Sequence, residues 1–256
     1  MKYLQKIANI LSIPVRLVRQ INSLKKQGYM AIFLLEGDIE IKLPKVALQN
    51  ILTKSGRSKI FKASMFTDRP LQEALLRKIV YELFQSRYLN YDKSIIDIGC
   101  WIGDNSLVWA KMLKEGRVYA IDGVSESLNF ASDIALINKI DNVHFNNAIC
   151  ADQSNLSLVS SGSQSGTYFN QTSSESRLKS TTIDEVIPLD CHGDIGLFHI
   201  DVEGFEEKVI LGSKQVIKSS RPVIIFEQHI SSENAGAIVN FLKNIDYTVF
   251  MINEVL

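Results

Sequence analysis

Cysteine and histidine are scarce in this sequence, and their spacing excludes several kinds of site. Cys100, Cys150 and Cys191 form no C-x-x-C pair, so we expect no disulfide framework and a reducing compartment, the cytoplasm. The four histidines offer no pair at metal-ligand spacing. We therefore predict a protein without a metal site.

Long apolar runs and an excess of one charge are also absent. No run approaches the length of a transmembrane helix, and the N-terminus lacks the compact apolar segment and cleavage site of a signal peptide. The 28 basic and 28 acidic residues balance, which argues against a nucleic-acid partner. A length of 256 residues suits one α/β domain with an N-terminal extension.

Acidic residues are missing from residues 1–30, where basic residues and apolar residues at helical spacing predict a basic amphipathic helix. The basic positions are Lys2, Lys6, Arg16, Arg19, Lys25 and Lys26. Such a helix either binds an anionic membrane surface peripherally or packs on the domain or on a subunit of a homo-oligomer. The apolar stripe serves both roles, and we favour packing.

Two nucleotide-binding fingerprints are missing, G-x-x-x-x-G-K-[ST] and G-x-G-x-x-G. Instead, an apolar strand at 94–98 carries Asp97 and leads into Gly99 and Gly103, with Trp101 where a dinucleotide site needs glycine. The next strand, 118–121, ends at Asp122. This arrangement predicts a nucleoside-binding βαβ unit and disfavours a nicotinamide-dependent oxidoreductase.

S-adenosylmethionine fits this turn better than a dinucleotide because it carries no phosphate. Asp97 is placed to hold the ammonium of its amino-acid end, and free N–H groups of the turn would face its carboxylate. Asp122 is placed to accept the ribose hydroxyls.

The first quarter of the chain, residues 1–68, is interpreted as an extension that precedes a domain of residues 69–256. Ala31–Leu35 and Ile39–Leu43 predict a hairpin. A helix is expected from Thr67-Asp68 to Phe84. Its apolar stripe would be Leu71, Leu75, Ile79 and Leu83.

Strands and helices alternate through the rest of the chain, which predicts a doubly wound, mostly parallel α/β sheet of Rossmann-like type. Strands are expected at 94–98, 118–121, 143–147, 195–200, 223–226 and 247–252, and helices at 104–114, 125–138, 204–218 and 233–244. Asp97, Asp122, Asp201 and Glu227 would then meet at one edge of the sheet.

Residues 151–182 form a serine-rich insertion in this alternation. Leu156–Val159 and Thr167–Phe169 could pair as a hairpin. A long loop at the ligand edge is either a lid that recognises substrate or a tolerated surface insertion, and the sequence does not separate the two.

Four motifs in order give the chain a family resemblance over residues 70–252. They are Asp97–Gly103, the Ser180–Val186 run, the run Ile200-Asp201-Val202-Glu203-Gly204-Phe205-Glu206, and Arg221–Glu227. Together they resemble the FkbM family of methyltransferases, which has the class I S-adenosylmethionine-dependent methyltransferase fold.

The resemblance implies S-adenosylmethionine as cofactor and O-methylation of a hydroxyl in a glycan or glycosylated natural product, as in polysaccharide biosynthesis. It implies cofactor contacts along the turn and the next two strand ends, and acceptor contacts from Asp201, Glu203 and Glu227. The expected cofactor-binding residues are Asp97, Gly99, Cys100, Trp101, Gly103, Asp122, Gly123, Ala148 and Asp152.

The chain departs from the family pattern at several positions. Cys100-Trp101 replaces the usual Ala-Asn, Asp122-Gly123 replaces Glu-Pro, and His199 stands where Lys is common. The family fold usually finishes with a strand hairpin, of which this chain holds only the first strand. Either the chain is truncated or the N-terminal β-element completes the sheet.

For the reaction, Asp201 is the first candidate for a general base, with His229 as the alternative and Glu227 beside them. His199 is expected to be a hydrogen-bonded core residue, and Glu203 either faces the acceptor or caps the next helix. A divalent cation held by these acids is less favoured than a metal-free mechanism. The competing interpretation is a non-catalytic binding module whose cofactor pocket is blocked by Trp101.

Overall fold

The computed structural model describes residues 29–33, 39–44, 74–163, 166–174, 177–227 and 235–252. Its centre is a parallel sheet of five strands in the order β11-β10-β3-β4-β5. These strands are β3 (Ser94–Ile98), β4 (Val118–Asp122), β5 (Val143–Asn147), β10 (Ile195–Ile200) and β11 (Val223–Phe226). The strand order reverses between β3 and β10, and such a switch point is where doubly wound folds bind ligands.

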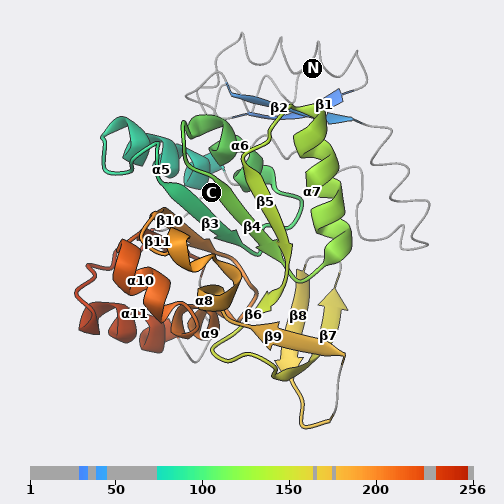
Figure 1. Ribbon diagram of the computed structural model, residues 1–256, viewed down its shortest axis with the longest axis vertical. Helices are drawn as coiled ribbons and strands as arrows, with labels where there is room; N and C mark the ends of the chain where they lie inside the picture. The colour runs from blue at the N-terminus through green and yellow to red at the C-terminus, as the bar shows by residue number, and fades with distance from the viewer. Residues whose placement is uncertain are drawn as a thin grey trace.

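Helices cover both faces of this sheet (Figure 1). The first face carries α5 (Ala74–Gln85), α6 (Asp104–Met112) and α7 (Ser125–Ile137). The second carries α8 (Ile183–Val186), α9 (Glu206–Leu211), α10 (Lys214–Ser220) and α11 (Ala235–Asn244). A short 3₁₀ turn, η1 (Leu189–Cys191), precedes β10.

Alternate residues of the central strands pack into two different cores, because successive side chains of a strand point to opposite faces of the sheet. Ile95 and Leu197 point into the core beneath α5, α6 and α7. Ile96 and Phe198, their sequence neighbours, point into the core beneath α8 to α11. The doubly wound α/β class predicted from the alternation is confirmed.

The helix that precedes β3 buries a different face from the predicted stripe. Leu75 is 37% exposed, whereas Arg77, Val80 and Phe84 are buried. The Arg77 guanidinium donates a hydrogen bond to Asn105 Oδ1 at 2.9 Å, which pairs this buried charge with the start of α6. The predicted stripe is therefore wrong at Leu75, whereas Leu83 packs against the core; Leu71 lies outside the described residues.

The hairpin of the N-terminal extension forms, as β1 (Tyr29–Phe33) paired antiparallel with β2 (Glu40–Pro44). The two strands make a sheet of their own, which lies beyond the amino ends of the central strands (Figure 1). The expectation that this element completes the central sheet is wrong. Residues 1–28, with the predicted basic helix, lie outside the described residues.

Two further predictions fail toward the C-terminus. The predicted helix 204–218 is two helices, α9 and α10, separated at Gly212 and Ser213. Gly212 packs so closely on Ala151 that a Cβ would lie 2.0 Å from the Ala151 carbonyl oxygen. Ser213 Oγ donates a hydrogen bond back to Val209 O at 2.5 Å. Such back-bonding bends helices. In the described segment 235–252, residues 247–252 form no strand.

The serine-rich insertion is a small sheet of four strands in the order β6-β9-β7-β8. The predicted hairpin is present as β7 (Ser157–Ser163) and β8 (Gly166–Gln171). It is joined through β9 (Leu178–Thr181) to β6 (Ile149–Cys150), which follows β5 almost at once. Figure 1 shows this sheet beyond the carboxyl ends of β4 and β5.

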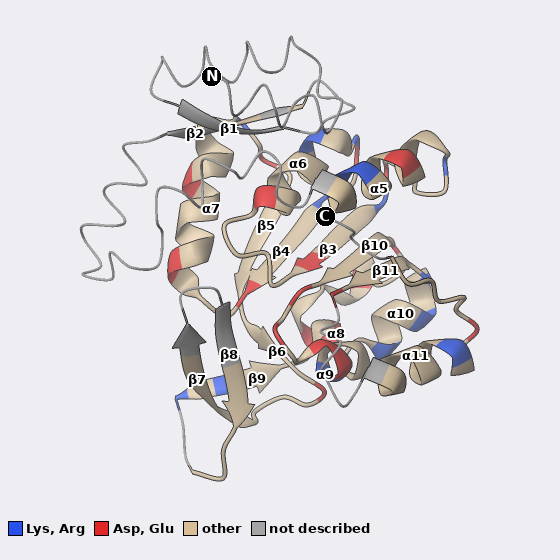
Figure 2. Cartoon of the chain, turned by 180° about the vertical axis from the view of Figure 1, so that it is seen from behind, with Lys and Arg blue, Asp and Glu red and all other residues tan. Residues whose placement is uncertain are grey.

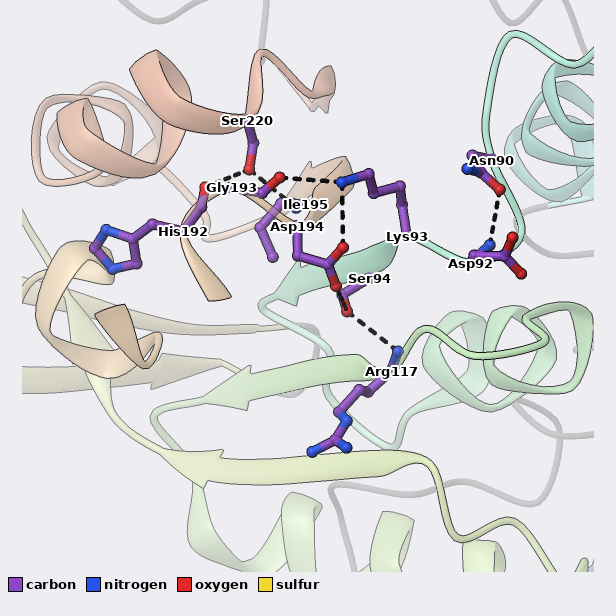
Figure 3. Close-up of polar contacts among 10 residues, drawn as sticks. All are labelled: Asn90, Asp92, Lys93, Ser94, Arg117, His192, Gly193, Asp194, Ile195 and Ser220. Carbon is purple, nitrogen blue, oxygen red and sulfur yellow. Dashed lines mark hydrogen bonds and ion pairs between the residues drawn. The ribbon is translucent and has the colours of Figure 1, made fainter. Parts of the chain in front are cut away.

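The opposite, amino end of the sheet is joined by a polar network (Figure 3). Ser94 Oγ donates to Asp194 Oδ2 at 3.0 Å and accepts from the Arg117 N–H at 3.3 Å. Lys93 Nζ lies 3.2 Å from Asp194 Oδ1. Ser220 Oγ accepts from the Ile195 N–H at 2.9 Å. These contacts fix the starts of the central strands relative to each other.

Candidate active site at the carboxyl edge

The carboxyl ends of the central strands are joined by backbone hydrogen bonds. The Gly99 N–H donates to Ile121 O at 2.9 Å, the Asp201 N–H to Ile98 O at 2.9 Å, and the Glu227 N–H to Ile200 O at 3.0 Å. Acidic positions gather along this edge in Figure 2. The predicted juxtaposition of Asp122, Asp201 and Glu227 at one edge is therefore present.

The turn after β3 is held by its own backbone. Gly99, Trp101 and Gly103 have φ of 78°, 47° and 72°, the left-handed region that favours glycine. The N–H groups of Gly99 and Cys100 donate to Ile121 O, that of Gly103 to Cys100 O, and that of Trp101 to Asp122 Oδ2 at 2.9 Å. The expected free N–H groups are thus not found at these four positions.

The two motif glycines make room for neighbouring protein. A Cβ on Gly99 would lie 1.6 Å from the Asp201 carbonyl oxygen, and a Cβ on Gly103 would lie 3.1 Å from Ala131 Cβ on α7. Gly99 therefore lets the Asp201 backbone rest directly on the turn. The glycine of the D-x-G motif thus serves the packing of the turn after β3 against the turn after β10, as well as the approach of a ligand.

Asp97 lies beneath the turn. It is 1% exposed and is the register partner of His199 on the neighbouring strand. His199 Nδ1 lies 2.8 Å from Asp97 Oδ1, and Ser106 Oγ donates to Asp97 Oδ2. The edge of the Trp109 ring packs on the His199 ring, with centroids 5.3 Å apart.

This arrangement corrects the placement of Asp97 at the open end of its strand. Both carboxylate oxygens are engaged inside the protein, so Asp97 positions α6 and β10 under the turn. His199 is the buried, hydrogen-bonded residue that its place in a strand predicted.

Asp122 ends β4 and is half-buried. Its Oδ1 accepts from the Val124 N–H at 2.7 Å and its Oδ2 from the Trp101 N–H. Burial raises the pKa of Asp122, and these two hydrogen bonds oppose the rise. Each carboxylate oxygen has a second lone pair, so the group can accept further hydrogen bonds from a ligand.

The far side of Asp122 is formed by the end of β5 and the start of the insertion. The Ala148 N–H and the Asn147 side-chain amide both donate to Asp122 O, at 3.1 and 2.9 Å. Asp152 lies nearby in sequence, and its Oδ1 is buried with no hydrogen-bond partner among the described residues. A buried acceptor without a donor costs free energy, and a ligand donor would remove that cost.

The turn after β10 places acids on the other side of Gly99. Asp201 and Glu203 are half-buried and Glu227 is exposed. Glu203 and Gly204 have φ of 52° and 103°. The Gly204 N–H donates to Glu206 Oε1 at 3.0 Å, so the side chain that closes this turn is Glu206. His229 lies outside the described residues.

The domain described as the methyltransferase FkbM domain matches residues 97–249 of this chain, which is more than half of its length. The chain belongs to the FkbM methyltransferase family. Its cofactor is therefore S-adenosylmethionine, and the protein is a methyltransferase.

Solved methyltransferase structures are similar to this FkbM methyltransferase only at low sequence identity. A precorrin-6y C5,15-methyltransferase from Geobacter metallireducens is 16% identical, covering 67% of this chain and 72% of its own, with a TM-score of 0.42. A SAM-dependent methyltransferase from Aquifex aeolicus is 13% identical, with coverages of 68% and 82% and a TM-score of 0.41. An rRNA methylase from Streptococcus thermophilus is 12% identical, with coverages of 68% and 89% and a TM-score of 0.41. No curated protein matches the chain.

All three cysteines of this FkbM methyltransferase are free, and Cys100 and Cys150 are buried. Burial raises the pKa of Cys150 to about 12. Burial, followed by the nearby Asp97 and Asp122 carboxylates, raises the pKa of Cys100. Cys100 therefore packs as a neutral thiol, because only a thiolate is nucleophilic.

Two residues near this site were missed by sequence reasoning. Ser106 could have been found, because it lies one turn into the helix that follows the glycine turn, on the side facing Asp97. Phe169 of β8 could not, since only the folded insertion brings it against Gly123.

The described residues contain no group of three or more His, Cys, Asp or Glu side chains that could hold a metal ion. Within the same residues, every helix is too short or too polar to cross a membrane.

Proposed function

We propose that this FkbM methyltransferase methylates a hydroxyl oxygen of a glycan or a glycosylated small molecule. The observation that carries the proposal is the position of Asp201, a half-buried carboxylate whose own backbone rests on Gly99 of the cofactor turn. A carboxylate beside the reacting centre can accept the proton that a hydroxyl must lose.

The residues around the turn fit S-adenosylmethionine. Asp122 has lone pairs left for the ribose hydroxyls, and the buried, unpartnered Asp152 Oδ1 suits the amine of the adenine. Gly99, Cys100, Trp101 and Gly103 would line the methionine end, with Asp97 fixing the turn from below. When bound, the cofactor would supply a methyl group on a sulfonium sulfur, with the neutral thioether as the leaving group when an in-line acceptor oxygen takes the methyl group.

The chain itself contributes orientation and proton transfer. Holding an acceptor oxygen in line with a methyl group can lower the barrier by roughly 7–11 kcal/mol, and a base adds about 10²–10⁴-fold. Asp201 is the proposed base, Glu227 would orient the acceptor from the adjoining strand end, and His229 stays the alternative base. No step in this proposal needs a metal ion.

The contacts of Trp101 favour an active enzyme over a blocked pocket. Its side chain is half-buried and packs against the core beneath α6 and α7, and its backbone N–H donates to Asp122 Oδ2. A ring seated against the core does not need to occupy the space of the cofactor. It can instead cover one side of a bound ligand.

The activity is tested by incubating the protein with S-adenosylmethionine labelled in the methyl group and a panel of lipid- and nucleotide-linked glycans. Mass spectrometry should find a product heavier by one methyl group on oxygen. Methylation of nitrogen or carbon, or of none of the glycans, would contradict the proposal for the acceptor while leaving the family assignment intact.

Replacing Asp201 with Asn tests the base. We expect kcat to fall by about 10²–10⁴-fold while the Kd for S-adenosylhomocysteine, measured by calorimetry, changes less than about twofold. Glu227→Gln serves as the comparison, with a larger change in acceptor KM than in kcat. Full activity of Asp201→Asn would remove Asp201 from the mechanism.

We also propose that residues 1–68 are an N-terminal extension of the catalytic domain of residues 69–256, and that residues 1–30 pack on the domain or on a second subunit. Sedimentation with anionic vesicles tests the alternative, peripheral membrane contact. Binding that salt abolishes would favour the membrane over packing.

A further inference from the structure

One aromatic side chain of the serine-rich insertion contacts the carboxyl edge of the central sheet, where the cofactor site is proposed. Phe169 on β8 packs against Gly123, the residue after Asp122. A Cβ on Gly123 would lie 2.6 Å from Phe169 Cζ and 3.0 Å from Ile149 Cγ1. Glycine at this position, where the family usually has proline, therefore leaves room for a phenylalanine ring from a distant part of the chain.

The position of Phe169 is fixed by strand pairing. Phe169 is the register partner of Ser160 on β7, and Ser157 on β7 pairs with Lys179 on β9. On β9, Ser180 and Thr181 then pair with Ile149 and Cys150. Leu158, fully buried, anchors the hairpin. The ring is thus held by a continuous ladder that begins at the end of β5.

The surroundings of Phe169 suit a flat nitrogen heterocycle. The ring is half-buried, so part of its surface remains available. Asp122, next to Gly123, is the proposed acceptor of hydrogen bonds from the ribose hydroxyls. Because the base of a nucleoside is bonded directly to its ribose, the adenine would lie close to Asp122. The aliphatic Ile149 and the buried Asp152 Oδ1 come from the segment beside it. Aromatic rings stack on bases without selecting among them, whereas a carboxylate oxygen selects an amine donor.

We propose that Phe169 contacts the adenine of the cofactor, so that the β7–β8 hairpin forms one wall of the nucleoside pocket. This inference rests on the proposed cofactor site at Asp122, and it assigns the insertion to cofactor binding rather than to acceptor recognition or surface decoration.

The test is calorimetric titration with S-adenosylhomocysteine and with 5′-methylthioadenosine, which keeps the nucleoside and lacks the amino-acid end. Phe169→Ala should raise the Kd for both ligands by at least about fivefold. Phe169→Tyr, which keeps the ring, should stay within twofold. Gln171→Ala, an exposed position on the same strand, should leave both Kd values unchanged.

Phe169→Leu separates stacking from packing. Leucine keeps an apolar contact with Gly123 and removes the aromatic face, so we expect the melting temperature to be kept and the affinity to be lost. Gly123→Ala should displace the ring and weaken binding by a similar factor, with a smaller effect in the Phe169→Ala background because the obstructed ring is gone.

The outcomes distinguish the proposed role of Phe169 from the proposed cofactor site at Asp122, on which that role rests. Wild-type binding with an unchanged Kd in Phe169→Ala, or full affinity in Phe169→Leu, would overturn the role of Phe169 alone. No binding of S-adenosylhomocysteine by the wild-type protein would overturn the cofactor site at Asp122, and this inference with it.

Discussion

At the scale of single residues, Asp122 shows how one carboxylate serves the protein and a ligand together. It holds the N–H groups of Trp101 and Val124, so the conformation of the glycine turn depends on it. Because buried acceptors must be satisfied, the turn is ordered before any cofactor arrives. A ribose would then meet a carboxylate that is already oriented.

The raised pKa of Asp122 gives a prediction for the pH dependence of cofactor binding. Ribose hydroxyls bind the ionised carboxylate more strongly than the acid. Since burial raises the pKa, the Kd for S-adenosylhomocysteine should begin to increase at a higher pH during acidification than an exposed aspartate would cause. Calorimetry at a series of pH values measures this onset.

Two variants complete that experiment. Asp122→Asn should bind S-adenosylhomocysteine at least about tenfold more weakly at neutral pH. Its Kd should no longer increase on acidification in the way that the wild-type Kd does. The exposed Asp133 on α7 supplies the control, and Asp133→Asn should follow the wild-type curve. An unchanged onset in Asp122→Asn would assign the pH dependence to another group.

The buried pair of Asp97 and His199 could have been predicted from the sequence. Asp97 stands two residues before Gly99, and His199 two residues before Asp201. Once β3 and β10 are neighbours in parallel register, these equal offsets place the two side chains opposite each other. The strand patterns predicted that β3 and β10 lie side by side, but the pairing of Asp97 with His199 was not predicted.

At the scale of elements, the turns after β3 and β10 behave as one unit because the Asp201 carbonyl occupies the space of a missing Gly99 side chain. The cofactor side and the acceptor side of the proposed site are therefore in direct backbone contact. Their relative position depends on a glycine more than on any side chain.

Gly99→Ala should destabilise the protein by about 2–4 kcal/mol, because alanine combines a positive φ with a backbone clash. Urea unfolding measures the loss. Gly236→Ala is a matched control on α11, where a Cβ meets nothing within 4 Å, and it should be neutral or stabilising by up to about 1 kcal/mol. Equal stability of the two variants would mean that the turns can separate freely.

Elements with strong periodicity were predicted well, and those shaped by distant contacts were not. Four of the five central strands, β3, β4, β10 and β11, are mostly apolar, as strands covered on both faces of a sheet are. The break at Gly212–Ser213 depends on the Ala151 carbonyl, about sixty residues away in sequence. Residues 247–252 have the composition of a strand, yet strand formation needs a partner.

At the scale of the whole molecule, the two ends of the sheet have different tasks. The amino end carries the Ser94–Asp194 network (Figure 3), and the carboxyl end carries the proposed site. Polar side chains at the amino end thus contribute to stability, whereas those at the carboxyl end are available for chemistry.

Ser94→Ala tests this division. Ser94 is 2% exposed and takes part in two hydrogen bonds, so its loss should lower the free energy of unfolding by about 1–2 kcal/mol. The Kd for S-adenosylhomocysteine should not change. Lys93→Ala, which removes a solvent-exposed ion pair, should cost less than about 1 kcal/mol. A weaker cofactor affinity in Ser94→Ala would show that the two ends of the sheet are coupled.

The attachment of the insertion has a consequence for how this enzyme could diversify. The small sheet joins the central domain through β6, a strand of two residues, and returns through β9. Everything between them can be exchanged without altering a strand of the central sheet. Recombination that replaced residues 157–171 would leave the amino-end network and both cores intact. Because the proposal for Phe169 makes this hairpin a wall of the nucleoside pocket, a replacement would keep cofactor affinity only if it again placed an aromatic ring against Gly123.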